Sequence, residues 1–212
     1  MKWEAFRTAT QNLDLIDATT LAQFAREDRG LYNQVSLWTR QGKIRRLTNG
    51  RYILNPVDYG KTISNEALSS RLVLDSYVSL QTALAHYRLI PDISHGLVVT
   101  AVTRRKTRIF TSPVGKFIYH HIRTTAFCGF TTVTDPHAKP YRLATREKSL
   151  LDALYFWPEK LRPSLDFLEE GLRLQQVETL SMRELRAWKG KFTPTMDQWI
   201  ETIIEFKKEN TR

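Results

Sequence analysis

The chain has 212 residues, of which 42% are hydrophobic and 25% are charged, and its formal net charge is +10 at pH 7. These proportions are ordinary for a globular protein. Its single cysteine permits no intrachain disulfide, no apolar run approaches the ~20 residues that a membrane-spanning helix needs, and the N-terminus lacks the apolar stretch of a signal peptide. We therefore expect a cytoplasmic protein without membrane contact.

Residues 3–54 carry the pattern of three helices followed by a β-hairpin. Apolar residues at a helical period predict a first helix over 3–13, and residues 14–18 predict a short strand that pairs with the hairpin. The capping-box pattern Thr20-x-x-Gln23 predicts the start of the second helix.

The third helix follows a tight turn. Leu31, Val35 and Trp38 stand at i, i+4 and i+7 and predict its buried face, and Gly42 predicts its end. The Asn-Gly pair at 49–50, between two runs of alternating apolar residues, predicts the hairpin turn. Helix, turn, helix and two-stranded wing together indicate a winged helix-turn-helix, which places its second helix in the major groove of DNA.

Polar side chains outside the apolar face of the third helix are of the kinds that contact DNA. Asn and Gln pair with adenine, Arg pairs with guanine, and Ser, Thr and Tyr bind phosphate. Basic residues continue into the hairpin, and arginines at a wing tip reach the minor groove or its phosphates. The alternatives are a solvated basic face, a contact of Gln34 with the neighbouring helix, and an internal salt bridge of Arg45 or Arg46. The predicted DNA contacts are Tyr32, Asn33, Gln34, Ser36, Thr39, Arg40, Lys43, Arg45, Arg46, Asn49 and Arg51.

A stretch with linker composition, 55–60, separates this unit from the rest of the chain. We place the boundary at residue 58, which gives a DNA-binding domain over 1–58 and a second domain over 59–212. The order of elements predicts an α+β fold whose C-terminal domain has several helices and a small, mostly antiparallel sheet. Helices are predicted over 64–74, 79–89, 145–157, 163–174, 181–189 and 195–208, and strands over 97–103, 107–111, 115–122, 129–134 and 140–144.

A second group of cations lies in the turn between two predicted strands. Four cations within five residues repel one another unless an anion is near. Nucleic acid, an acidic partner protein and solvent are the three surroundings that we consider. This group, the basic turn, consists of Arg104, Arg105, Lys106 and Arg108.

No catalytic or metal-binding constellation can be assembled from the sequence. His120 and His121 are adjacent in a predicted strand, so their side chains face opposite ways and cannot share a metal. The stretch 97–130 contains no Asp or Glu, which argues against a metal-dependent nuclease. Cys128, flanked by aromatic residues and glycine, is interpreted as a buried structural thiol. We expect no enzymatic activity, no cofactor and no metal.

Two motifs follow the winged unit. Residues 77–84 read Tyr-Val-Ser-Leu-Gln-Thr-Ala-Leu, in a segment interpreted as a helix that continues to residue 90. Residues 144–155 read Ala-Thr-Arg-Glu-Lys-Ser-Leu-Leu-Asp-Ala-Leu-Tyr, and the basic strand segment lies between the two motifs. Over residues 15–175 the chain resembles the AbiEi family, the antitoxins of type IV toxin–antitoxin systems.

The resemblance implies an autorepressor that binds inverted repeats of double-stranded DNA upstream of its own operon. It also implies a C-terminal domain that counters a nucleotidyltransferase-like toxin without forming a stable complex with it. Self-association on DNA is a further expectation. Two alternatives stay open: a stand-alone winged-helix regulator whose C-terminal domain oligomerises or senses a ligand, and a nucleic-acid-processing enzyme, against which the missing carboxylates argue.

Overall fold

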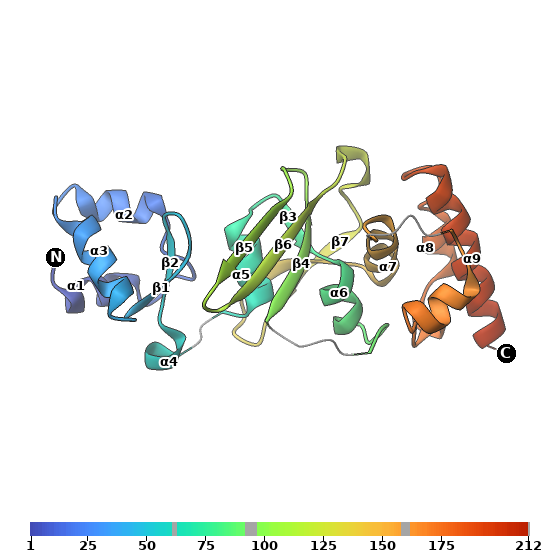
Figure 1. Ribbon diagram of the computed structural model, residues 1–212, viewed down its shortest axis with the longest axis horizontal. Coiled ribbons are helices and arrows are strands. Elements are labelled where there is room, and N and C mark those ends of the chain that lie inside the picture. The colour runs from blue at the N-terminus through green and yellow to red at the C-terminus, as the bar shows by residue number, and fades with distance from the viewer. Residues whose placement is uncertain (61–62, 92–96, 158–161, 212) are drawn as a thin grey trace.

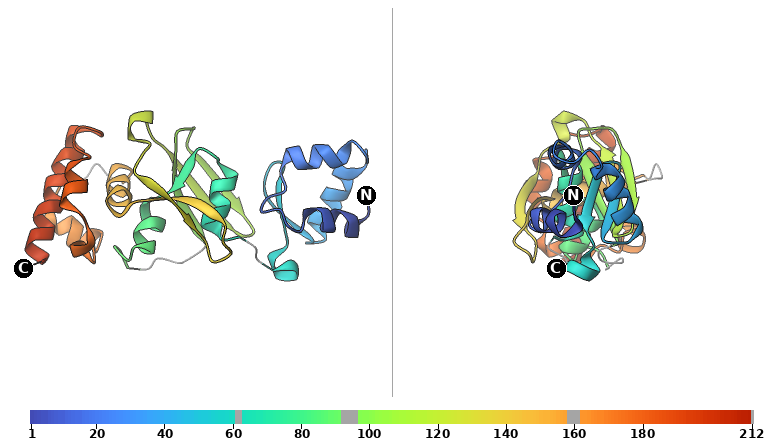
Figure 2. Two further views of the ribbon diagram at one scale, coloured as in Figure 1. Left: turned by 180° about the vertical axis from the view of Figure 1, so that it is seen from behind. Right: turned by 90° about the vertical axis from the view of Figure 1, so that its left-hand side faces the viewer.

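The computed structural model describes residues 1–60, 63–91, 97–157 and 162–211, and it has an α+β fold. Three blocks follow one another along an elongated molecule: N-terminal helices with a hairpin, a large sheet with its helices, and a C-terminal group of helices (Figures 1 and 2). Within the described ranges, no helix combines the length and the apolar character needed to cross a membrane.

Residues 1–54, the N-terminal unit, contain three helices and an antiparallel hairpin. The second helix begins earlier than predicted, because the carboxylate of Asp17 caps it by accepting a hydrogen bond from the backbone N–H of Thr20 at 2.8 Å. Gly42 ends the third helix with a φ of 73°, and Ile16 forms a bridge with Tyr52, both as predicted. The elements are α1 (Trp3–Thr10), α2 (Ala18–Ala25), α3 (Leu31–Arg40), β1 (Ile44–Thr48) and β2 (Arg51–Leu54).

The predicted buried face of α3 is confirmed. Leu31, Val35 and Trp38 are all buried, and Trp38 is only 5% exposed. The Trp38 ring lies 4.7 Å from the ring of Phe6 and 5.2 Å from that of Trp3, so α1 supplies its aromatic neighbours. The N-terminal unit thus has a core of its own, built on the face of α3 that the sequence periodicity marks.

The sheet is larger and less antiparallel than predicted. In the part of the chain that the structure describes, six strands take the order β5-β6-β4-β3-β8-β7, and the pairs β4–β6 and β3–β8 are parallel. The prediction missed β3 because it is short and ends at Val78, immediately before a helix whose periodicity hid it. The strands are β3 (Ser76–Val78), β4 (Val98–Thr103), β5 (Arg108–Ser112), β6 (Gly115–His121), β7 (Phe130–Thr134) and β8 (Pro140–Ala144).

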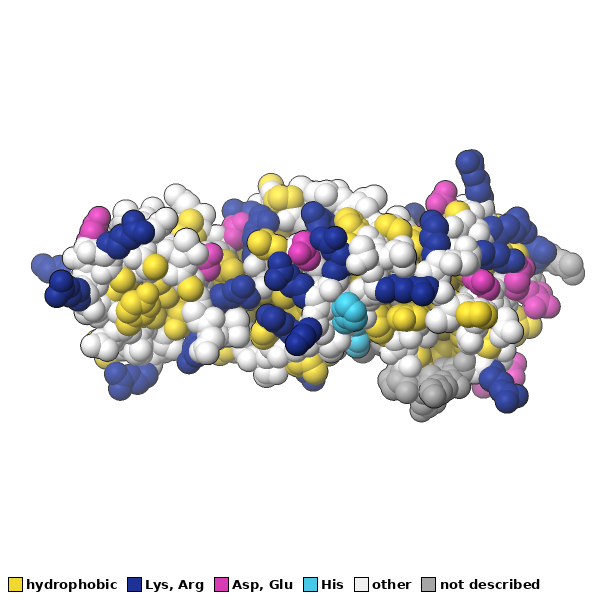
Figure 3. All heavy atoms as spheres, turned by 90° about the horizontal axis from the view of Figure 1, so that it is seen from above, with side chains coloured by type: hydrophobic (Ala, Val, Ile, Leu, Met, Phe, Trp, Pro, Cys, Tyr) yellow, Lys and Arg dark blue, Asp and Glu magenta, His cyan; other side chains and the backbone are white. Residues whose placement is uncertain are grey.

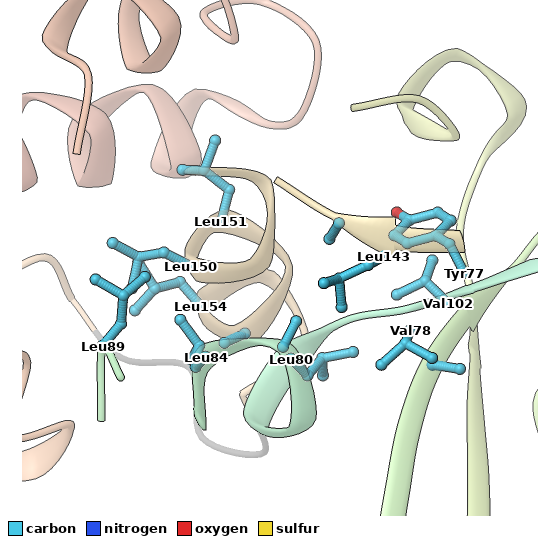
Figure 4. Close-up of a cluster of buried hydrophobic side chains, with 14 of the residues drawn as sticks. Tyr77, Val78, Leu80, Leu84, Leu89, Val102, Leu143, Leu150, Leu151 and Leu154 are labelled. Carbon is cyan, nitrogen blue, oxygen red and sulfur yellow. The ribbon is translucent and has the colours of Figure 1, made fainter. Parts of the chain in front are cut away.

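Helices cover both faces of this sheet. α5 (Asn65–Leu72) packs on one face, where the hydroxyl of Tyr119 donates to the backbone carbonyl of Ser69 at 2.8 Å. On the other side, α6 (Leu80–His86) and α7 (Arg146–Tyr155) pack against each other; in Figure 4 Leu84 of α6 lies beside Leu154 of α7, whereas Leu151 points away from α6.

The remaining elements are short, apart from the last helix. The helix predicted over 163–174 is instead largely a π-helical turn, η2, and the predicted linker contains the helical turn α4. A boundary at residue 58 would fall inside α4. These elements are α4 (Pro56–Tyr59), η1 (Thr124–Ala126), η2 (Phe167–Gly171), η3 (Val177–Thr179), α8 (Met182–Arg186) and α9 (Pro194–Asn210).

The N-terminal unit is joined to the sheet by its hairpin and by ion pairs. Leu47 and Ile53 of the hairpin belong to the large hydrophobic core rather than to the core of the N-terminal unit. Asp14 pairs with Lys139 at 2.7 Å and with Arg71 at 3.4 Å, so one carboxylate of the N-terminal unit holds two cations of the sheet region. The joint is therefore a packed interface.

Candidate nucleic-acid interface

One stripe of α3 is exposed along its whole length. Asn33, Ser36, Leu37 and Arg40 stand at i, i+3, i+4 and i+7, the spacing of a single helical face, and all four are exposed. Tyr32, 54% exposed, lies beside this stripe near the N-terminal end of the helix. The stripe therefore offers an amide, an apolar group and a guanidinium to a partner, whereas the hydroxyl of Ser36 already donates to the backbone carbonyl of Tyr32 at 3.0 Å.

Leu37 was absent from the predicted contacts although it belongs to this stripe. Its side chain is 44% exposed. The helical spacing from Asn33 and Arg40 could have identified it. An apolar side chain among polar ones suits the methyl group of thymine in the major groove.

Two predicted contacts on α3 are occupied within the fold. The amide nitrogen of Gln34 donates to the carboxylate of Asp28 at 3.2 Å, so this side chain contacts the turn before α3. The hydroxyl of Thr39 donates to the backbone carbonyl of Val35 at 2.7 Å. Both side chains are only partly exposed, so neither shares the open stripe with Arg40.

The exposed cation of the hairpin is Arg46, whose guanidinium donates to the amide oxygen of Asn49 across the β-turn. Lys43, just before β1, is half-buried and holds its ammonium 5.2 Å above the ring of Trp3. Arg46 and Asn49 are the hairpin residues that remain available to a partner, and Lys43 has a packing role besides its charge.

Two arginines of the hairpin are turned toward the sheet instead. Arg45 pairs in register with Ile53, and its Nε donates to the amide oxygen of Asn55 at 3.2 Å. Arg51 donates to the backbone carbonyl of Leu72, at the end of α5, at 2.6 Å. Within the described ranges neither Arg45 nor Arg46 forms the internal salt bridge that we considered.

The basic turn is exposed and its charge is partly neutralised. Asp75 lies 3.4 Å from Arg104 and 3.3 Å from Arg105, so a nearby anion does accompany these cations. Ion pairs this exposed contribute little stability, and one carboxylate leaves most of the charge of the turn uncompensated. Together with His121 the turn lines a shallow hollow, and Figure 3 shows basic side chains beside a histidine over the middle of this face.

The basic turn and the hairpin turn are neighbours. Arg108 and Phe110 of β5 line one hollow with residues 48–51 of the hairpin and with Asp17. The pKa of the Asp17 carboxyl is lowered, chiefly by the backbone N–H of Thr20 and to a smaller degree by Arg51. The cations of the two regions thus belong to adjoining surfaces rather than to opposite ends of the molecule.

Of the described histidines, His86 and His120 line one pocket, and His121 lines the hollow of the basic turn. His120 is half-buried with its ring 4.9 Å from that of Phe156, and burial lowers its pKa, whereas His121 is exposed on the opposite side of β6. His95 lies outside the described residues. Within those residues no group of three or more His, Cys, Asp and Glu side chains could hold a metal ion.

Cys128 is exposed, so its interpretation as a buried thiol is wrong. The flanking aromatic residues Phe127 and Phe130 do turn inward, with ring centroids 5.2 Å and 4.8 Å from that of Tyr77. Their burial leaves the thiol between them on the outer side of the loop.

No known family model and no curated protein matches the chain.

The exposed residues described above form one candidate interface, which consists of the exposed stripe of α3, the Arg46–Asn49 turn and the adjoining basic turn.

Proposed function

We propose that the N-terminal unit, residues 1–54, forms a winged helix-turn-helix that binds double-stranded DNA, with α3 as the recognition helix and the β1–β2 hairpin as the wing. The observation that carries this proposal is the exposed stripe Asn33, Ser36, Leu37 and Arg40, directly opposite the buried face of α3. Asparagine can pair with adenine, arginine with guanine, and an apolar side chain can contact the thymine methyl group. The side chains of this stripe are therefore suited to contact specific bases as well as phosphates.

The charge distribution supports a nucleic-acid partner. The chain carries a net charge of +10, and the basic turn adjoins the tip of the hairpin. In this arrangement the wing and the basic turn contact the phosphates that flank the bases contacted by α3. Phosphate contacts of this kind supply affinity and position, whereas the stripe of α3 supplies specificity.

The resemblance to the AbiEi family extends the proposal to an autorepressor of its own operon and an antitoxin against a nucleotidyltransferase-like toxin. The motifs that carry the resemblance come together in space: Tyr77 and Ser79 of the first both donate to Asp152 of the second. The second candidate function is that of a stand-alone regulator that senses a ligand. A cavity at the joint between the N-terminal unit and the sheet favours this second candidate.

The DNA-binding proposal is tested by titrating the full chain onto a fragment of its own upstream region at several salt concentrations. For Arg40→Ala with Arg46→Ala, we expect weaker binding and a slope of log K against log salt that falls by about 0.9 for each phosphate that the variant no longer neutralises. Arg183→Ala, which removes an exposed cation of α8, is the control and should leave both quantities unchanged. Unchanged affinity and slope in the double variant would overturn the proposal.

The antitoxin proposal is tested separately by co-expressing the full chain with the product of the neighbouring gene. Restored growth in the presence of a toxic nucleotidyltransferase-like neighbour is the expected result. If that protein is toxic and the full chain does not restore growth, the antitoxin role is wrong and the stand-alone regulator remains.

A further inference from the structure

A cavity of about 330 Å³ lies at the joint between the N-terminal unit and the sheet. Its walls come from five separate segments: Leu13 after α1, Ile53 of the hairpin, Tyr59 of α4, Leu68 of α5 and Val114 of the β5–β6 turn. Pockets for small molecules favour such joints between structural units, and this volume lies at the lower end of their usual range. The cavity is therefore of the size that a small metabolite needs.

The walls are more apolar than polar, and two of the described residues that line the cavity are charged. Asp14 is already neutralised by its ion pairs with Lys139 and Arg71. Arg45 is different: its Nε donates to the neutral amide oxygen of Asn55, and no carboxylate within the described ranges forms an ion pair with it. Arg45 is therefore a cation of the cavity wall whose charge no described carboxylate compensates by an ion pair.

The register of the hairpin explains why Arg45 lines the cavity. Arg45 stands opposite Ile53, so their side chains lie on the same face of the hairpin, the face turned toward the sheet. Arg46, the next residue, is on the opposite face and is exposed. The side chains of these two adjacent arginines therefore lie in different surroundings: Arg45 lines the cavity, and Arg46 is exposed to solvent.

We propose that this cavity binds a small apolar carboxylic acid. The carboxylate pairs with the guanidinium of Arg45, whose planar array of donors matches two carboxylate oxygens. The hydrocarbon part lies against Ile53, Leu68 and Val114. An uncharged molecule of the same shape gains the apolar contacts alone, because it leaves the guanidinium without an anion. Since the walls come from both sides of the joint, the ligand holds the N-terminal unit against the sheet.

The test is isothermal titration calorimetry of the full chain with benzoate and with hexanoate, and with benzamide as the uncharged analogue of benzoate. We expect saturable binding of at least one acid, and affinity for benzamide weaker than that for benzoate by roughly tenfold. In Arg45→Gln, which keeps a donor for Asn55, affinity for the acids should fall by roughly tenfold or more. Arg46→Gln is the matched control and should stay within about twofold of the unsubstituted chain.

Val114→Trp tests the same site by volume rather than by charge. The indole should fill the cavity and abolish binding of both acids while the far-ultraviolet circular dichroism spectrum stays unchanged. The proposal is overturned if the folded chain binds neither acid saturably, if benzamide binds as tightly as benzoate, if Arg46→Gln weakens binding as much as Arg45→Gln, or if Val114→Trp binds the acids as the unsubstituted chain does.

Discussion

The hydroxyl of Tyr77 in β3 donates a hydrogen bond of 3.0 Å to the carboxylate of Asp152 in α7, and both side chains are completely buried. Ser79 donates to the same carboxylate oxygen at 2.7 Å. Burial, together with the charge of Asp152, raises the pKa of Tyr77 far above its usual value, so the phenol stays a neutral donor. The strand β3 and the helix α7 are thus linked by buried hydrogen bonds from which water is excluded.

Lys148, one helical turn before Asp152, completes this buried network. Its ammonium forms an ion pair with the other oxygen of Asp152 and is itself fully buried. Its nitrogen lies 5.2 Å from the ring of Trp188 and 4.9 Å from that of Phe192. The aromatic faces partly compensate the missing hydration of the cation, and they connect the C-terminal helices to the sheet.

Asp152→Ala should destabilise the fold strongly. The substitution leaves the ammonium of Lys148 buried without its carboxylate, which typically costs about 3–5 kcal/mol. Urea unfolding followed by circular dichroism measures the difference. Asp166→Ala removes an exposed carboxylate and should change the free energy of unfolding by less than about 0.5 kcal/mol. A loss below about 1 kcal/mol for Asp152→Ala would mean that the ammonium of Lys148 finds another partner.

Gly129 and Gly190 form a matched pair for a second prediction. Their φ angles are 76° and 74°, so an alanine is similarly strained at both positions. A Cβ at Gly129 would overlap the ring of Trp188, whereas a Cβ at Gly190 would meet no atom within 4 Å. Gly129→Ala should therefore be less stable than Gly190→Ala by about 1–3 kcal/mol, measured as the difference between their urea midpoints at equal m-values. Equal losses would show that the Trp188 ring moves aside freely.

Charge reversal separates the possible surroundings of the basic turn. Because Arg108 of this turn adjoins the hairpin, the proposed function predicts that Arg105→Glu with Lys106→Glu weakens binding to the upstream DNA and flattens its salt dependence, while the growth rescue of the proposed antitoxin test is retained. Arg183→Glu with Arg186→Glu places the same charge change on α8 and should leave operator binding unchanged. Absence of rescue with retained DNA affinity would instead assign the turn to an acidic partner. If neither activity changes, the turn is only solvated.

Acidification should destabilise the protein partly through His120. Burial lowers the pKa of this imidazole, against a smaller opposing effect of Asp152. Below about pH 6.5 the unfolded chain takes up a proton that the folded chain resists, so stability falls as the pH decreases through this range. In His120→Gln the loss of unfolding free energy between about pH 7.5 and about pH 5.5 should be smaller than in the unsubstituted chain. The same loss in His120→Gln and in the unsubstituted chain would contradict the prediction.

The sequence determined the features that depend on near neighbours. The buried face of α3 follows from the spacing of Leu31, Val35 and Trp38, and the hairpin turn from an Asn-Gly pair, because backbone periodicity and turn conformation are local properties. The same helical spacing also places Leu37 on the exposed face of α3, although the predicted DNA contacts did not include this residue. The α+β class also followed from the order of the helical and strand patterns, because that order can be read along the chain.

The tertiary structure decided everything that depends on distant partners. The short strand β3 exists because β4 and β8 lie on either side of it, and Lys148 is buried because Trp188 and Phe192 cover it. Arg45 and Arg46 have the same side-chain chemistry, yet the hairpin turns one into a cavity and the other outward. Sequence spacing gives the faces of an element, but what each face meets is set by packing between segments far apart in the chain.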